Sequence, residues 1–175
     1  MITRCVHIFP KFKEAELLHD IREKYDYLHK CIEPHITLVF PFESNIETNI
    51  LVEDIKSTLK GYKSFKVIGK GIQGIDNYGY YLFLNIEEGS EIIKELHYSL
   101  HKGILKNYQS EWTKDGSFKP HVTIGRFKDR DEMLNAAKLY ENIEVEYEAF
   151  IDKVYIEIIG ENEESIIEKE IGIEE

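Results

Sequence analysis

Two short stretches of the chain repeat one pattern, and this repeat constrains the fold more than any other feature. Residues 34–38 have the sequence PHITL, and residues 120–124 have the sequence PHVTI. Both lie in apolar, β-branched surroundings, over 35–42 and 121–127, which is typical of strands. Side chains two positions apart on a strand point to the same face, so each stretch places an imidazole beside a hydroxyl.

The pattern is significant because it occurs twice. A single His-x-Ser/Thr sequence is a weak signal, and the chain contains a third example at His97-Tyr98-Ser99, without a preceding proline and in a helical pattern. Two complete copies on two predicted strands favour a shared site that contains His35 with Thr37 and His121 with Thr123. The alternative is a pair of core histidines, each beside a strand threonine.

The two copies resemble the paired His-x-Thr/Ser motifs of the 2H phosphoesterase superfamily, which includes bacterial 2′-5′ RNA ligases and 2′,3′-cyclic phosphodiesterases. The matching segments are His35-Ile36-Thr37 and His121-Val122-Thr123. The resemblance implies two pseudo-symmetric lobes that face each other across a central cleft. It also implies that both histidines are catalytic and that both threonines bind phosphate.

The resemblance further implies a phosphate-contacting arginine five residues after the second motif histidine. Arg126 occupies that position, whereas Phe40 occupies the matching position after His35. Strand parity places positions 121 and 126 on opposite faces, so Arg126 reaches the site only if the strand twists, bulges or ends there. The alternative is a solvent-exposed basic residue.

The order of predicted elements repeats along the chain. Apolar periodicity predicts helices over 14–30, 46–60, 90–107 and 130–140, and strands over 3–10, 35–42, 64–72, 78–86, 121–127, 143–150, 153–159 and 164–171. A strand, a long helix, a motif strand and a second helix occur twice in succession. Strands and helices do not alternate as a regular parallel series, so we expect an α+β fold in which each lobe is a mainly antiparallel sheet packed with helices. Residues 1–175 should form one bilobal domain.

Composition limits the partners. The formal net charge of −11 argues against long duplex nucleic acid and is compatible with a small anionic substrate or a single RNA end. We find no apolar run near the ~18 residues of a membrane helix, and no signal peptide. Cys5 and Cys31 are too few for a disulfide framework. We therefore expect a cytoplasmic monomer with reduced thiols and no membrane association.

No stretch of the sequence predicts a cofactor or a metal. The glycines at positions 69, 71 and 74 lack the order of a phosphate-binding loop. His97 and His101 are four residues apart and could share a metal, but ordinary surface histidines are the expected interpretation. The aromatic residues Tyr78, Tyr80, Tyr81 and Phe118 could stack on a base or belong to the core.

The motif residues suffice for phosphodiester hydrolysis without a metal. One histidine can deprotonate the attacking oxygen while the other protonates the leaving oxygen, and threonine hydroxyls can donate to the non-bridging oxygens. We therefore expect a metal-independent phosphoesterase that hydrolyses a 2′,3′-cyclic phosphate, or a related cyclic or 2′-5′ phosphodiester, of a nucleotide or RNA end. The alternatives are a non-catalytic module that binds phosphorylated nucleotides or RNA ends, and an ATP-independent 2′-5′ RNA ligase.

Overall fold

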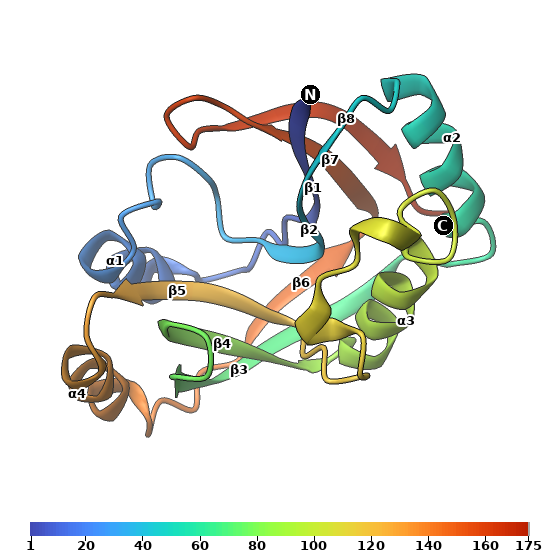
Figure 1. The fold of residues 1–175 in the computed structure, drawn as a ribbon. Coiled ribbons are helices and arrows are strands. Elements are labelled where there is room, and N and C mark those ends of the chain that lie inside the picture. Colours follow the sequence, from blue (N-terminus) through green and yellow to red (C-terminus); the bar gives the residue numbers. More distant parts are fainter. Residues whose placement is uncertain (175) are drawn as a thin grey trace.

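The computed structural model describes residues 1–174, which form two four-stranded antiparallel sheets and four α-helices (Figure 1). The first sheet has the order β2-β1-β7-β8, with strands Ile36–Ser44, Ile2–Ile8, Lys153–Ile159 and Ser165–Gly172. The second sheet has the order β5-β4-β3-β6, with strands His121–Phe127, Tyr80–Glu88, Phe65–Ile75 and Tyr147–Ile151. The expected α+β fold is confirmed.

The two sheets share one arrangement. In each, the strand that carries the motif lies at the sheet edge and pairs with the strand that precedes it in sequence, β1 for β2 and β4 for β5. Both inner strands then pair antiparallel with a third strand, β7 or β3. The repeated order of elements therefore corresponds to a repeated topology, which gives the two motifs equivalent places.

The helices are exchanged between the two sheets. Helix α1 (Glu16–Tyr25) precedes β2 but packs against β5, and helix α3 (Ser90–Leu100) precedes β5 but packs against β2. Helix α2 (Thr48–Leu59) packs against α3 and β8, and helix α4 (Arg130–Tyr140) packs against β3 and β4. Each motif strand is thus covered by a helix from the other half of the repeat.

One continuous apolar core lies between the sheets and these helices. It contains the core-facing neighbours of the motif residues, Ile36, Leu38, Val122 and Ile124, all of which are fully buried. Burying such side chains stabilises the fold by roughly 1.5–3 kcal/mol each. A slip of one residue would expose them, so their burial fixes the register of the motif strands.

Three predicted boundaries are wrong. The helix predicted over 14–30 ends at Tyr25, because Asp26 is extended (φ −119°, ψ 101°) and its Oδ1 accepts a hydrogen bond from the Leu28 amide at 3.1 Å. The helix predicted over 90–107 ends at Leu100. The strand predicted over 143–150 begins only at Tyr147. Within residues 1–174, no helix is both long and apolar enough to cross a membrane.

Candidate functional site

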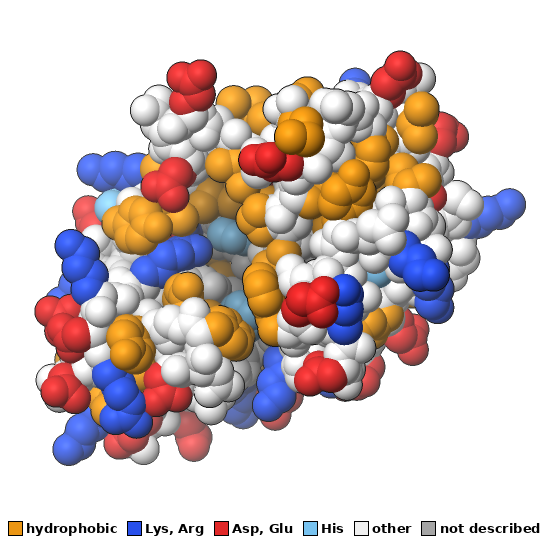
Figure 2. Space-filling view, viewed as in Figure 1, with side chains coloured by type: hydrophobic (Ala, Val, Ile, Leu, Met, Phe, Trp, Pro, Cys, Tyr) orange, Lys and Arg blue, Asp and Glu red, His pale blue; other side chains and the backbone are white. Residues whose placement is uncertain are grey.

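A cavity of about 450 Å³ is lined by residues of both sheets, and both motifs contribute to its wall. Its lining includes all five residues expected to form the site: His35, Thr37, His121, Thr123 and Arg126. The space-filling view shows histidine surfaces at the bottom of a hollow that is bordered by hydrophobic side chains (Figure 2). Residues that are distant in sequence therefore share one solvent-accessible recess.

The two motif histidines are held in the same way. Nδ1 of His35 lies 2.8 Å from the carbonyl oxygen of Glu33, and Nδ1 of His121 lies 2.8 Å from the carbonyl oxygen of Lys119. Since a carbonyl only accepts, Nδ1 carries the proton in both rings. The Nε2 atom of each neutral ring is then an unprotonated base that is left for a ligand in the cavity.

The surroundings of both rings favour the neutral form. Removal from water lowers the pKa of His121 to about 4, and the positive charge of Arg126 lowers it further, against the opposing effect of the Lys119 carbonyl. Removal from water also brings the pKa of His35 well below its usual value, with additional lowering by His7 and Arg126. Both imidazoles are therefore neutral at pH 7 in the free protein.

A β-bulge brings Arg126 to the cavity. Thr123 pairs with Phe83, but Gly125 pairs with the next residue of β4, Leu82, so β5 contains one extra residue at this point. Ile124 and Gly125 are consequently both buried, and Arg126 returns to the face that carries the motif histidine. Strand parity required a twist, a bulge or a strand end for Arg126 to reach the site, and this bulge meets that condition.

The first motif strand has a matching irregularity. Thr37 pairs with His7, and Val39 pairs with Val6, which again leaves one extra residue after the motif threonine. Leu38 and Val39 are both buried, and Phe40 faces the cavity. Phe40 is thus the counterpart of Arg126, so only the β5 side supplies a guanidinium at this position.

A buried ionic cluster holds Arg126 in place. Its Nη1 contacts Oδ1 of Asp26, which is 1% exposed and follows directly after α1. The other oxygen of Asp26 accepts a hydrogen bond from Arg22 Nε at 3.1 Å, and Arg22 Nη2 donates to the Ile32 carbonyl at 2.7 Å. Sequence analysis missed Arg22 and Asp26; their spacing of four residues beside a buried helix face was the available signal.

Aromatic rings form the remaining wall of the cavity. Phe83 stacks on the ring of His121, with centroids 3.6 Å apart and an interplanar angle of 12°. Tyr78 and Trp112 lie nearly parallel at 6.3 Å and are 56% and 54% exposed, so both offer free ring surface to a ligand. Phe40 and Tyr81 complete this wall.

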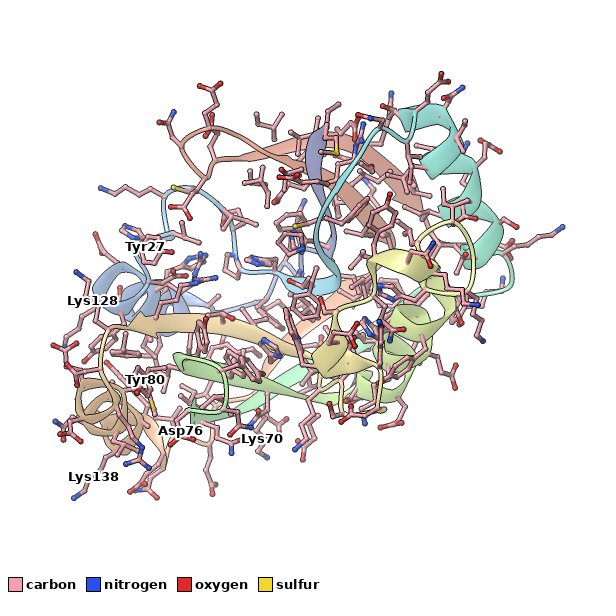
Figure 3. The ribbon with its side chains drawn as sticks, viewed as in Figure 1. Tyr27, Lys70, Asp76, Tyr80, Lys128 and Lys138 are labelled. Atoms are coloured by element: carbon pink, nitrogen blue, oxygen red, sulfur yellow. The ribbon has the colours of Figure 1, made fainter. Side chains whose placement is uncertain are left out.

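Two of the predicted stacking residues lie elsewhere. Tyr80 is not part of the cavity lining and lies at the end of the molecule near α4 (Figure 3). Phe118 is 4% exposed and stacks on His97, with centroids 3.9 Å apart. The alternation of β4 separates Tyr80 from Tyr81, so only Tyr78 and Tyr81 of the predicted group reach the cavity.

His97 and His101 are not surface residues, contrary to expectation. They are 0% and 5% exposed, and Nδ1 of His97 lies 2.7 Å from the Leu38 carbonyl in the first motif strand. Nδ1 of His101 lies 2.7 Å from the His97 carbonyl. Burial lowers the pKa of His97 to about 4. His97 therefore connects α3 to β2, His101 contacts the end of its own helix, and neither lines the cavity.

Comparison with known proteins places this geometry in a family. A family model described as the 2′-5′ RNA ligase superfamily matches residues 9–159. A protein of Halalkalibacterium halodurans named "Putative phosphoesterase" is 27% identical over 152 residues, which cover 86% of this chain and 85% of the relative. A relative from a Geobacillus species with the same designation is 27% identical over 154 residues, covering 86% and 84%.

Solved structures share the fold at low sequence identity. A crystal structure of a Thermus thermophilus protein superposes with a TM-score of 0.66 at 14% identity and covers 98% of both chains. The E. coli LigT complex with 3′-AMP superposes with a TM-score of 0.59 at 11% identity and covers 99% of both chains. LigT has also been crystallised with ATP and with NADP+.

Proposed function

This chain belongs to the 2′-5′ RNA ligase superfamily, and from that premise we propose that its cavity hydrolyses a 2′,3′-cyclic phosphate, or a related cyclic or 2′-5′ phosphodiester, of a nucleotide or an RNA end. The proposal rests chiefly on one observation. Two histidines from opposite sheets, each with its Nδ1 fixed by a carbonyl, line one cavity together with two hydroxyls and one guanidinium.

The reaction requires one histidine on each side of the phosphorus. Nε2 of one neutral imidazole accepts a proton from water as the water oxygen forms a bond to phosphorus. The bond from phosphorus to the ring's 2′ or 3′ oxygen breaks, and the other histidine, as an imidazolium, gives its Nε2 proton to that oxygen. One proton is taken up and one is released, so a phosphomonoester is formed without any other reactant.

The hydroxyls and the guanidinium stabilise the charge that gathers on the non-bridging oxygens. Thr37 and Thr123 lie two positions after their histidines and line the same cavity, so each can donate one hydrogen bond to the phosphate. Arg126 can add a charge-assisted hydrogen bond. The rigid contact with Asp26 keeps the guanidinium oriented before substrate arrives.

Substrate binding must restore the proton to one histidine. In the free protein both rings are neutral at pH 7, because burial and Arg126 lower both pKa values. A bound phosphate anion raises the pKa of a neighbouring histidine, since opposite charges favour the charged form. We therefore expect a bell-shaped profile of kcat/KM with an optimum below pH 6.5, and a kcat profile displaced to higher pH.

The aromatic wall favours a nucleoside as the rest of the substrate. Tyr78 and Trp112 expose ring faces in the cavity that contains the motif residues, and stacking of a base on an aromatic ring contributes about 1–3 kcal/mol. Crystallised LigT complexes contain the nucleotides 3′-AMP, ATP and NADP+, and LigT shares this fold. The net charge of −11 favours a small substrate over a long nucleic acid.

A substrate panel tests the proposal. The purified chain should be incubated with 2′,3′-cyclic mononucleotides, ADP-ribose cyclic phosphate and 2′-5′ dinucleotides, and the products separated by chromatography. We expect turnover of at least one member, unchanged by EDTA, and no turnover by a preparation of the His35→Ala/His121→Ala double variant. Tight binding without hydrolysis in calorimetry, or activity abolished by EDTA and restored by added metal, would contradict the proposal.

A further inference from the structure

Three potential metal ligands that are not motif residues lie together in the wall of the cavity, next to His35. Cys5 and His7 are two positions apart on β1, so their side chains point to the same face of the sheet. Glu157 on β7 is the direct cross-strand partner of Cys5. One ligand atom from each residue lies within 4.8 Å of the other two. All three side chains also line the cavity that contains the motif histidines.

The three residues are deeply buried. Cys5, His7 and Glu157 are 2%, 3% and 3% exposed, so a carboxylate, an imidazole and a thiol are withdrawn from water at one point. A buried carboxylate is costly unless it is paired. The imidazole of His7 lies 3.4 Å from Oε1 of Glu157 and neutralises the carboxylate only when it carries a proton.

The polar atoms of this group are only partly satisfied by the described protein. Nδ1 of His7 is buried without a hydrogen-bond partner among residues 1–174. Oε2 of Glu157 accepts a hydrogen bond from the hydroxyl of Ser165, which fixes the carboxylate. Burial and the nearby Glu157 charge raise the pKa of the Cys5 thiol, so the thiol is protonated when no cation is near.

We propose that Cys5, His7 and Glu157 form a binding site for a zinc-like divalent cation in the wall of the cavity. A thiolate, an imidazole and a carboxylate are all ligands of zinc, whereas magnesium and calcium prefer oxygen ligands alone. Three protein ligands leave a fourth tetrahedral position open, and the placement of all three in the cavity wall makes that position accessible from the cavity.

Sequence spacing could not indicate this site. Cys5 and Cys31 show no metal-binding spacing, and the third ligand lies on a strand near the end of the chain. The pairing of β1 with β7 brings the residues together. The site lies beside His35, since the rings of His7 and His35 are 4.6 Å apart, and its test measures metal binding directly without using catalytic activity.

Cobalt spectroscopy tests the site on the full chain without an affinity tag. Protein stripped with a chelator is titrated with Co²⁺, and the absorption spectrum is recorded. We expect saturation at one equivalent, with a thiolate-to-cobalt charge-transfer band in the near ultraviolet. Zn²⁺ should remove the band by displacing Co²⁺, and Mg²⁺ should leave it intact.

Matched variants assign the ligands. Cys5→Ser should lose the charge-transfer band, whereas Cys31→Ser and His121→Ala should retain it; Glu157→Gln should bind Co²⁺ more weakly. The chain has two cysteines, so retention in Cys31→Ser assigns the sulfur to Cys5 even if Cys5→Ser does not fold. No band in the wild type, a band lost in Cys31→Ser, or cobalt absorption without a sulfur contribution would overturn the proposal.

Discussion

The two motif strands are alike in their scaffold and different in their surroundings. At the start of both β2 and β5, the Nδ1 atom of the motif histidine contacts a carbonyl oxygen two residues earlier, and a bulge follows the threonine. The rings beside the histidines differ: His7 lies edge-on to His35 at 4.6 Å, whereas Phe83 lies flat on His121 at 3.6 Å. The repeat therefore preserves position without preserving the chemical environment.

The position after the bulge shows the same contrast. It is occupied by Phe40 on β2 and by Arg126 on β5. The side of the cavity formed by β5 is therefore charged, and the side formed by β2 is apolar at this point. We infer that a phosphate is held more strongly from the β5 side, which would give the two histidines unequal distances to it.

The largest effect should come from removing either histidine. His35→Ala and His121→Ala should each lower kcat about 10²- to 10⁴-fold on any cyclic phosphate that the parent cleaves, because each removes one proton transfer. Steady-state rates and their pH profiles measure this loss. Each single variant should keep the rise or the fall of the bell-shaped pH profile that belongs to the remaining histidine. Wild-type turnover by either variant would show that the two strands are not functional counterparts.

The threonines provide the next test. Thr37→Val and Thr123→Val conserve shape and remove one donor each, so each should lower kcat about 10²-fold while KM changes little. Equal losses would indicate that both strands contact the phosphate in the same way. A loss confined to Thr123→Val would place the phosphate on the β5 side only, and no loss in either variant would exclude both hydroxyls from the reaction.

Replacing the two residues after the bulges tests the charge difference directly. Arg126→Met should lower kcat/KM about 10- to 100-fold, as expected for loss of a charge-assisted hydrogen bond. The matched variant Phe40→Met should spare the affinity for inorganic phosphate, measured by calorimetry, because it removes no charge. Equal weakening of phosphate binding by both variants would contradict the inferred asymmetry.

The smallest effect concerns stability in acid. The pKa of His97 is lowered from 6.5 to about 4 by burial, so the unfolded chain binds more protons between these values. The contribution of neutral His97 to the free energy of unfolding is therefore fully present above pH 6.5 and falls as the pH drops toward 4. Between pH 7 and pH 5 the loss from His97 should be about 1–2 kcal/mol.

Urea unfolding at the two pH values measures this contribution. His97→Phe should reduce the difference in the free energy of unfolding between pH 7 and pH 5 by about 1–2 kcal/mol. The variant also loses the contact with the Leu38 carbonyl, but at both pH values. His19→Phe is the matched control because His19 is exposed. If the free energy of unfolding of His97→Phe still depends on pH as it does in the wild type, this buried histidine does not couple α3 to β2 through its charge state.

Local sequence was sufficient for the parts of the fold that depend on local periodicity. The motif strands, the placement of Thr37 beside His35, and helix α4 follow from alternation or from apolar spacing. The order of elements also predicted the α+β class, and the family resemblance implied its division into two lobes. These features need no knowledge of the partner segment, because the side-chain pattern alone determines which face is buried.

The remaining features depend on pairing between distant segments. The bulge that redirects Arg126 appears only in the register between β4 and β5, and the burial of His97 depends on α3 packing against β2. Asp26 ends α1 and also pairs with Arg126, a hundred residues away in sequence. Strand parity and helical spacing carry no information about such contacts. The sequence therefore left the placement of Arg126 open, and the expectation that His97 lies on the surface was wrong.

The exchange of α1 and α3 between the sheets has a consequence for how the protein can come apart. A fragment that ends in the β3–β4 turn would leave β2 without α3, and the complementary fragment would leave β5 without α1. We therefore expect the halves to melt together in a single transition rather than one after the other, and separately expressed halves to recover structure only when mixed.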